Sequence, residues 1–342
     1  MRNIFMKSLA ATLLSASIAL VPALAETKIP FTLDWRFEGP SAPYFMAIDQ
    51  GHFKAEGLEV EIAAGQGSLD AIPKVASGAY PLGFADMSSL IKFLDQNPEA
   101  PVTAVMMLYD KPAFAVVGLK SRGVEKPADL EGKTLGAPPP DGAWAQFPAF
   151  AAANNLDMAK IKIEPVGFPT REPMLAEGKV DAVTGFSFTS FLNTLRLGVE
   201  EKDISVILMA DHGLALYGNA IIVNKDFATK HPEQVTGFLR AVAKGLQGVV
   251  NDPKAGIEAM VSRNPAMDKA LELRRLEIAL KDNIMTDWVL KNGLGNIDSE
   301  RFAKSLEQIK QTYTFKKEPD ARLYFTADYL PSDGSLTVKA AP

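Results

Sequence analysis

The hydrophobic and polar positions of the chain follow a pattern typical of alternating strands and helices. Short apolar runs that fit buried strands stand at residues 29–33, 58–62, 82–85, 102–108 and 114–119. Helix-length segments lie between them, with apolar positions at the spacing of one buried face, and Gly or Pro stands at most of the joints. This alternation predicts βα units and a parallel sheet, and therefore an α/β fold.

The same rhythm restarts after residue 126 and predicts a second, smaller α/β lobe. Its expected strands are residues 161–166 and 180–185, and its expected helices are residues 143–154, 171–177 and 188–195. Beyond two further apolar runs, at 206–209 and 220–223, the chain becomes helical, and residues 232–250 carry a stripe of period 3.6. Because helices alone cannot form another sheet, we expect them to pack on the first lobe.

The order of these segments predicts two lobes joined by two connections. We assign residues 26–118 and 219–330 to lobe 1 and residues 119–218 to lobe 2. The chain then crosses between the lobes near residues 113–121 and again near residues 212–224. A two-stranded connection of this kind predicts a hinge.

Both ends of the chain are expected to lie outside the two lobes. Two cations within the first seven residues precede an apolar run at 9–20, and Ala23 and Ala25 provide the small side chains that signal peptidase needs. We therefore predict that residues 1–25 are a signal peptide, cleaved after Ala25, and that the protein is periplasmic. No later segment has 18 uninterrupted apolar residues, so the mature chain should not insert into a membrane. The polar tail 331–342 lacks a period and is expected to be loosely ordered.

Composition and motifs exclude several classes of function. The 342 residues carry 36 Lys and Arg against 41 Asp and Glu, and a net charge of -5 opposes nucleic-acid binding. The absence of cysteine excludes disulfides, thiolate zinc sites, iron–sulfur clusters and cysteine nucleophiles. Gly132-Lys133-Thr134 resembles the end of a phosphate-binding loop, but Pro127 stands where its first Gly is needed. Thr189 likewise stands where a serine-hydrolase elbow needs Gly. We expect neither enzymatic activity nor a metal or cofactor.

The candidate ligand-binding residues follow predicted strands or begin predicted helices. Trp35 follows the first strand, and Trp144 follows a Pro-rich loop in lobe 2, so both indoles could meet in a cleft at the carboxyl ends of the strands. Alternatively, each indole packs on its own lobe. The helices that start at Ser68 and at Ala143 offer free N–H groups to a ligand, or are capped by local side chains and water. The full candidate set is Trp35, Arg36, Gly67, Ser68, Asp86, Asp141, Trp144, Arg171, Phe186, Ser187, His212 and Tyr217.

Two arginines in this set predict the charge of the ligand. Arg36 follows the first strand and Arg171 follows a strand and loop of lobe 2, so the two guanidinium groups could bind an anion from opposite sides. The alternative is that Arg36 pairs with Glu38 and that Arg171 pairs with Glu172 or Glu177.

Several segments resemble one family of proteins. These are residues 31–35 (FTLDW), 47–62 (AIDQGHFKAEGLEVEI), 76–86 (ASGAYPLGFAD), 126–136 (KPADLEGKTLG) and 176–182 (AEGKVDA). They are similar to the periplasmic substrate-binding proteins of ABC importers for nitrate, sulfonates, taurine and thiamine-pyrimidine precursors.

The resemblance implies a two-lobe, type II-like periplasmic binding fold that closes on a ligand and delivers it to a permease and its ATPase. We expect a monomer and, from Arg36 and Arg171, a ligand that is a small organic anion such as a sulfonate, a carboxylate or an aromatic acid. A neutral thiamine-pyrimidine-type heterocycle is the alternative ligand. An enzyme of pyrimidine-precursor synthesis on the same scaffold is the alternative of another class, with Asp34, Asp86, Asp141 and the histidines as the available acid–base groups.

Overall fold

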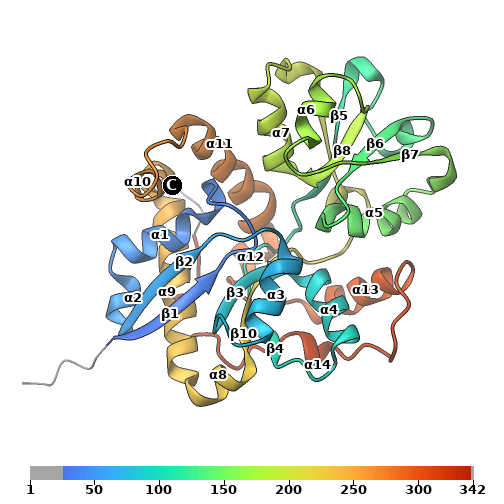
Figure 1. Cartoon of the computed structure of the whole chain (residues 1–342). Helices are drawn as coiled ribbons and strands as arrows, with labels where there is room; N and C mark the ends of the chain where they lie inside the picture. The colour runs from blue at the N-terminus through green and yellow to red at the C-terminus, as the bar shows by residue number, and fades with distance from the viewer. Residues whose placement is uncertain (1–25, 340–342) are drawn as a thin grey trace, which may run out of the picture.

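Two five-stranded sheets, each covered by helices, form the two lobes of the computed structural model, which describes residues 26–339 (Figure 1). The first sheet has the order β2–β1–β3–β10–β4, with strands Leu58–Ala63, Thr27–Thr32, Leu82–Asp86, Asn219–Asn224 and Val102–Met107. The second has the order β7–β6–β8–β5–β9, with strands Lys162–Pro165, Thr134–Ala137, Ala182–Phe186, Phe114–Leu119 and Ile204–Leu208. The predicted two-lobe α/β fold is confirmed.

Both sheets are mixed, which corrects the prediction of a parallel sheet. In lobe 1, β1 runs parallel to β2 and β3, whereas β10 is antiparallel to β3 and β4. In lobe 2, β5 is antiparallel to β8 and β9. Strands β5 and β10 are those that enter a lobe directly from the other one. Both strands start at the end of the sheet that faces the partner lobe, and they are therefore antiparallel to their neighbours.

The first boundary between the lobes lies earlier than predicted. Strand β5 was assigned to lobe 1 up to residue 118, but Val116 and Val117 pair with Thr184 and Val183 of β8 in the lobe 2 sheet. The connections are therefore residues 108–113 and 209–218. The reason is that an apolar run reveals a strand but not the strand with which it pairs.

Helices cover both sheets. Lobe 1 carries α1 Ala42–Asp49, α2 His52–Ala55, α3 Ser68–Ala76 and α4 Met87–Gln96, and lobe 2 carries α5 Gly142–Ala153, α6 Arg171–Ala176 and α7 Ser187–Arg196. The C-terminal part of the chain adds α8 Lys225–Lys230, α9 Pro232–Asn251, α10 Pro253–Val261, α11 Lys269–Ala279, α12 Asp287–Asn292, α13 Ser299–Lys310 and α14 Ala321–Tyr324, with a π-helical turn at Leu280–Ile284.

Helix α9 shows why this C-terminal part packs on lobe 1. The predicted stripe of α9 is buried, with Phe238 and Val242 fully inaccessible, and the helix packs along α1. Gly245 allows this approach, because a Cβ there would lie 2.2 Å from the carbonyl oxygen of Pro43. The expected packing of the helices on lobe 1 is therefore found, although α11 and α13 also contact lobe 2.

The structure describes most of the predicted C-terminal tail but not the predicted signal peptide. The predicted signal peptide, residues 1–25, lies outside the described residues, as do residues 340–342. The rest of the tail is packed, contrary to the expectation of loose order. Val338 is buried in the lobe 1 core, the N–H of Leu294 donates to the carbonyl of Leu336 (2.8 Å), and the N–H of Lys339 donates to Gln247 (2.9 Å). Within residues 26–339, no helix is both long and apolar enough to cross a membrane.

Candidate ligand-binding cavity between the lobes

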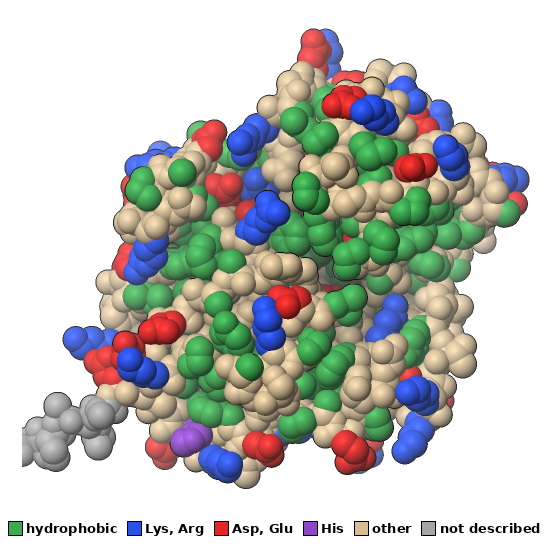
Figure 2. All heavy atoms as spheres, in the orientation of Figure 1, with side chains coloured by type: hydrophobic (Ala, Val, Ile, Leu, Met, Phe, Trp, Pro, Cys, Tyr) green, Lys and Arg blue, Asp and Glu red, His purple; other side chains and the backbone are tan. Residues whose placement is uncertain are grey.

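A cavity with about 540 Å³ of empty space lies where the carboxyl ends of strands from both lobes meet. Figure 2 shows hydrophobic side chains gathered around a hollow along the line between the lobes. Lobe 1 contributes Asp34, Trp35, Gly67, Ser68, Leu69, Asp86 and Ser89, and lobe 2 contributes Phe114, Pro140, Asp141, Gly142, Phe168, Arg171, Phe186 and Thr189.

A smaller hollow of about 380 Å³ adjoins the cavity and shares Asp34, Trp35 and Phe186 with it. Arg36, Glu38, Tyr44 and Tyr109 are among its other lining residues. The Tyr44 hydroxyl is buried and has no hydrogen-bond partner in the described part of the chain. The two hollows together give the interlobe space an aromatic and carboxylate lining.

Two glycines place the Asp34–Trp35 turn at the cavity. The carbonyl of Trp35 accepts from the N–H of Gly65 (3.0 Å), and the carbonyl of Asp34 accepts from the N–H of Gly67 (2.5 Å). A Cβ on Gly65 would lie 2.1 Å from the Leu33 carbonyl oxygen, and Gly67 has a φ of +113°, which favours glycine. The loop before α3 therefore lies directly against the turn after β1.

Asp34 is the most strongly perturbed acid of the cavity. Its Oδ2 accepts from Asn219 Nδ2 (2.6 Å) and from Ser68 Oγ (3.1 Å). Burial raises the pKa of Asp34 to about 7, because the desolvation of its charged form outweighs these two hydrogen bonds. Near neutral pH this carboxyl can therefore either donate or accept a hydrogen bond.

Two further carboxyls lie at helix starts that face the cavity. Asp86 ends β3 and caps α4 through the Ser89 N–H (2.7 Å on Oδ1), while its buried Oδ2 has no protein partner among the described residues. Burial raises the pKa of Asp86 to about 6. Asp141 caps α5 and accepts from Thr184 Oγ1 (2.8 Å), and burial also raises its pKa. The cavity thus contains three carboxyls that bind protons more tightly than free aspartate.

The two arginines do not form the predicted anion clamp. Arg171 does line the cavity, but its guanidinium donates to Glu172 Oε1 (2.6 and 2.8 Å), so its charge is already balanced. Arg36 is exposed at the rim of the adjoining hollow, with its guanidinium 5.6 Å from the centre of the Trp35 ring. The expected pairing of Arg36 with Glu38 is not found, since Glu38 contacts Arg275 instead (3.3 Å).

Aromatic rings form the walls, but only one of the two predicted tryptophans belongs to them. The Trp35 ring meets Phe168 of lobe 2 edge-on, with centroids 4.9 Å apart, and Phe114 lies 5.8 Å from Phe186. Trp144 is absent from the described lining and stacks on Phe147 of its own helix at 5.7 Å. Trp144 therefore packs on its own lobe in this structure, as the alternative prediction describes.

Three other predicted site residues also lie outside the described lining. Ser187 is buried at the start of α7 with a hydroxyl that has no partner among residues 26–339. His212 lies in the second connection, with its ring edge-on to Phe150 at 6.5 Å. Tyr217 belongs to the hinge. The structure instead brings to the cavity residues that sequence reasoning missed, namely Leu69, Ser89, Phe114, Pro140, Gly142, Phe168 and Thr189, together with Asp34, which it had considered only as an acid–base group.

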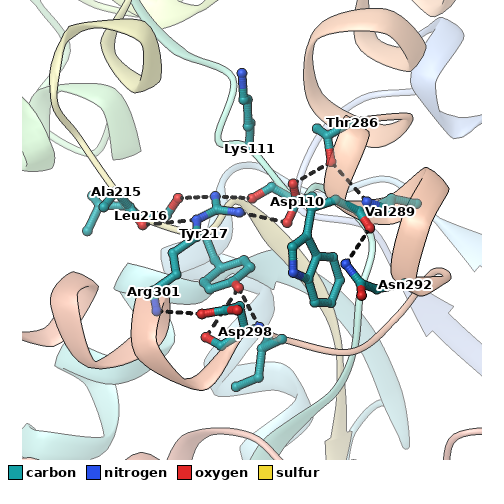
Figure 3. A network of polar contacts seen from close by, with 12 residues as sticks. Asp110, Lys111, Ala215, Leu216, Tyr217, Thr286, Val289, Asn292, Asp298 and Arg301 are labelled. Atoms are coloured by element: carbon teal, nitrogen blue, oxygen red, sulfur yellow. Dashed lines mark hydrogen bonds and ion pairs between the residues drawn. The ribbon is translucent and has the colours of Figure 1, made fainter.

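Arg301 joins both connections between the lobes (Figure 3). Its guanidinium donates to Asp110 Oδ1 (2.7 Å) in the first connection and to the carbonyls of Leu216 (2.9 Å) and Ala215 (3.3 Å) in the second. The same group lies 4.1 Å from the centre of the Tyr217 ring. The predicted hinge region is thus tied to α13, and Tyr217 is part of that structure rather than of the cavity.

No group of His, Cys, Asp or Glu among residues 26–339 is arranged to hold a metal ion. The cavity residues offer aromatic faces and hydrogen-bonding groups. They suit the binding of a flat, polar organic molecule.

Comparisons with known proteins identify relatives that are named for different functions. A formylaminopyrimidine-binding protein from Halalkalibacterium halodurans is 27% identical over 231 residues, which are 67% of this chain and 68% of the relative. A riboflavin-binding protein from Chloroflexus aurantiacus is 26% identical over 297 residues, with 85% and 82% covered. A 4-amino-5-hydroxymethyl-2-methylpyrimidine phosphate synthase from Saccharomyces cerevisiae is 24% identical over 290 residues, with 80% and 83% covered.

The fold and the family are clear from two further comparisons. The periplasmic aliphatic sulphonate-binding protein from Escherichia coli superposes with a TM-score of 0.69 at 12% identity, covering 86% of this chain and 96% of that one. This likeness confirms the periplasmic binding protein fold. The family model described as "NMT1/THI5 like" matches residues 39–256. The chain therefore belongs to the NMT1/THI5-like family.

Proposed function

We propose that the protein is the solute-binding component of an ABC importer and that it binds a neutral, flat nitrogen heterocycle with hydrogen-bond donors. The observation that carries this proposal is the charge balance of the cavity. Its described lining contains Asp34, Asp86 and Asp141, whereas its one arginine, Arg171, is already paired with Glu172. An anion placed here would meet three buried acids without a free cation, so the neutral alternative is favoured over the predicted organic anion.

The raised pKa of Asp34 supports a nitrogen heterocycle in particular. A carboxyl with a pKa of about 7 can donate to a ring nitrogen when it is protonated and accept from an amino group when it is ionised. Both protein hydrogen bonds to Asp34 use Oδ2, which leaves Oδ1 for the ligand. Aromatic contact for such a ring would come from the lining residues Trp35, Phe114 and Phe186.

Family and sequence support the transport role. The fold is that of periplasmic binding proteins, two relatives are named for binding formylaminopyrimidine and riboflavin, and the first 25 residues have the pattern of a signal peptide. On this proposal the mature protein is a periplasmic monomer. Its partners are the permease and ATPase of the importer, which would recognise the two lobes closed around the ligand.

A thermal-shift panel tests the proposed ligand class. The heterocycles are 4-amino-5-hydroxymethyl-2-methylpyrimidine, cytosine and riboflavin, and the anions are taurine, nitrate and benzoate. A ligand at 100 times its Kd adds about 2.7 kcal/mol of stability, and we expect this from a heterocycle and from none of the anions. Trp35→Ala should remove the shift, whereas the matched variant Trp144→Ala should retain it. A largest shift from taurine, nitrate or benzoate would return the anion to first place.

A synthase is the second candidate because some relatives carry that name. The two functions differ in what happens to the bound molecule. The protein is saturated with the stabilising heterocycle, incubated and denatured, and the released molecule is weighed by mass spectrometry. A binding protein returns the molecule unchanged, and any change in its mass that depends on the protein would favour the enzyme.

A further inference from the structure

A buried cluster of charged residues joins the lobes at a place distinct from the hinge. At its centre is Arg275 of α11, whose side chain is 2% exposed. Two acids of lobe 1 neutralise it, with Glu272 Oε2 at 3.1 Å from Nε and Glu38 Oε2 at 3.3 Å from Nη1. Glu272 also accepts from the N–H of Gly39 (2.6 Å), which ties α11 to the segment that follows Trp35.

The same cluster reaches across to α7 of lobe 2, which lies beside α11 (Figure 1). Arg275 donates to the carbonyl of Phe188 (3.4 Å) and to Asn193 Oδ1 (3.3 Å). Glu38 Oε2 accepts from Thr189 Oγ1 (2.8 Å). Each of these three bonds joins the two lobes.

Glu38 also touches the wall of the cavity. Its Oε1 accepts from Trp35 Nε1 at 3.3 Å. One carboxylate therefore contacts the cavity indole, the buried cation of lobe 1 and a hydroxyl of lobe 2. This links the position of the Trp35 ring to the contact between the lobes.

We propose that Arg275 and Glu38 form a latch that holds the lobes together and couples their closure to a ligand at Trp35; this inference rests on the proposed binding function. The hinge contacts of Arg301 involve only the connections and α13, so they can persist when the lobes rotate. The latch bonds join surfaces without a short covalent connection and must break when the lobes separate.

The physical chemistry of the cluster makes the latch reversible. When the lobes are together, Arg275 is out of water and needs all its partners, because a buried guanidinium without acceptors is costly. When the lobes separate, water replaces Phe188, Asn193 and Thr189 as hydrogen-bond partners, so opening loses only the net difference between these bonds and bonds to water. A ligand that fixes the Trp35 indole also fixes its bond to Glu38, and thereby favours the closed state.

Distance measurements between the lobes test the latch, and the chain is suited to them because it has no cysteine. Lys54 on lobe 1 and Lys202 on lobe 2 are both exposed, so Lys54→Cys and Lys202→Cys can carry two spin labels. The distance distribution is measured by double electron–electron resonance in the ligand-free protein and with 4-amino-5-hydroxymethyl-2-methylpyrimidine. Arg275→Met and the milder Asn193→Ala are compared with Arg263→Met, which removes an ion pair to Asp49 within lobe 1.

We expect Arg275→Met to lower the ratio of closed to open protein roughly tenfold, the effect of one charge-assisted hydrogen bond, and Asn193→Ala to lower it less. Arg263→Met should leave it unchanged. The pyrimidine should also dissociate faster from the latch variants than from wild type, at a nearly unchanged association rate. A loss of folding stability alone does not produce this combination.

Equal distance distributions in wild type, Arg275→Met and Asn193→Ala would overturn the latch. A wild-type protein that binds the pyrimidine and still shows the open distance alone would overturn it as well. Failure of the pyrimidine to bind would count against the proposed ligand class, while the ligand-free distances would still decide on the latch.

Discussion

Replacing Asp34 by Asn tests whether the burial of this carboxyl lowers the stability of the folded protein near neutral pH. Asparagine has the same shape, and its Oδ1 can accept the bonds from Asn219 and Ser68 that Asp34 Oδ2 now accepts. The substitution therefore removes the ionisable group while it keeps the local hydrogen bonds. The expected result follows from the pKa of Asp34, which burial raises from 3.8 to about 7.

The sign and the size of the effect follow from proton linkage. Between pH 4 and pH 7 the folded protein holds the Asp34 proton and the unfolded chain does not, so this group lowers the free energy of unfolding as pH rises. One pKa unit is worth 1.36 kcal/mol, so the whole window is worth about 4 kcal/mol. The free energy of unfolding of Asp34→Asn, relative to that of wild type, should rise by this amount between pH 4 and pH 8 and should not rise further above about pH 8.

Urea unfolding of both proteins at a series of pH values measures this gain. The difference between the two free energies cancels the titration of groups that the variant leaves unchanged. Asp86→Asn is an informative comparison, because the pKa of Asp86 is raised only to about 6 and its gain should be smaller, about 3 kcal/mol. A difference between Asp34→Asn and wild type that stays constant from pH 4 to pH 8 would refute the reasoning.

Three further predictions concern other parts of the molecule. Ligand binding should change the fluorescence of Trp35 because it lines the cavity, so Trp35→Phe should abolish the change and Trp144→Phe should retain it; the opposite result would show that the wall is assigned to the wrong indole. Arg301→Met should lower the free energy of unfolding by about 3 kcal/mol in urea, because Asp110 stays buried without its cation, and a loss below about 1 kcal/mol would contradict the hinge analysis. Intact mass of the exported protein should correspond to cleavage after Ala25, and a mass that retains residues 1–25 would contradict the signal peptide.

The elements of the fold could be predicted from local pattern, but their partners could not. The strand at 114–119 was predicted with the bounds that the structure has, yet it was placed in the wrong lobe. Its apolar side chains require burial on both faces, and either sheet could provide that burial. The choice depends on pairing with residues about 70 and 90 positions further along the chain, which periodicity does not encode.

The site shows the same limit at the level of single side chains. Trp35 could be assigned to a cleft because it follows a strand, and the carboxyl ends of strands face the partner lobe. Trp144 lies in the first turn of α5, where its direction around the helix axis decides between the cavity and Phe147. Arg171 lines the cavity, but its guanidinium pairs with Glu172, which is the alternative predicted for it, and not with Arg36 around an anion. Glu38 was considered only as a partner for Arg36, because Arg275 is more than 200 residues away in sequence.

The unsatisfied groups of the cavity indicate how it selects its ligand. Asp86 Oδ2 and the Tyr44 hydroxyl are buried and have no protein partner among the described residues, and a buried polar group that stays unpaired costs about 1–3 kcal/mol. A ligand that donates to Asp86 and bonds to Tyr44 recovers this energy on binding. An analogue of the same shape without those groups leaves the cost in place and loses the contact as well. Sites built in this way discriminate more strongly by hydrogen-bonding pattern than by size. We therefore expect that replacing a donor group of the ligand by a methyl group weakens binding more than adding a methyl group elsewhere on the ring.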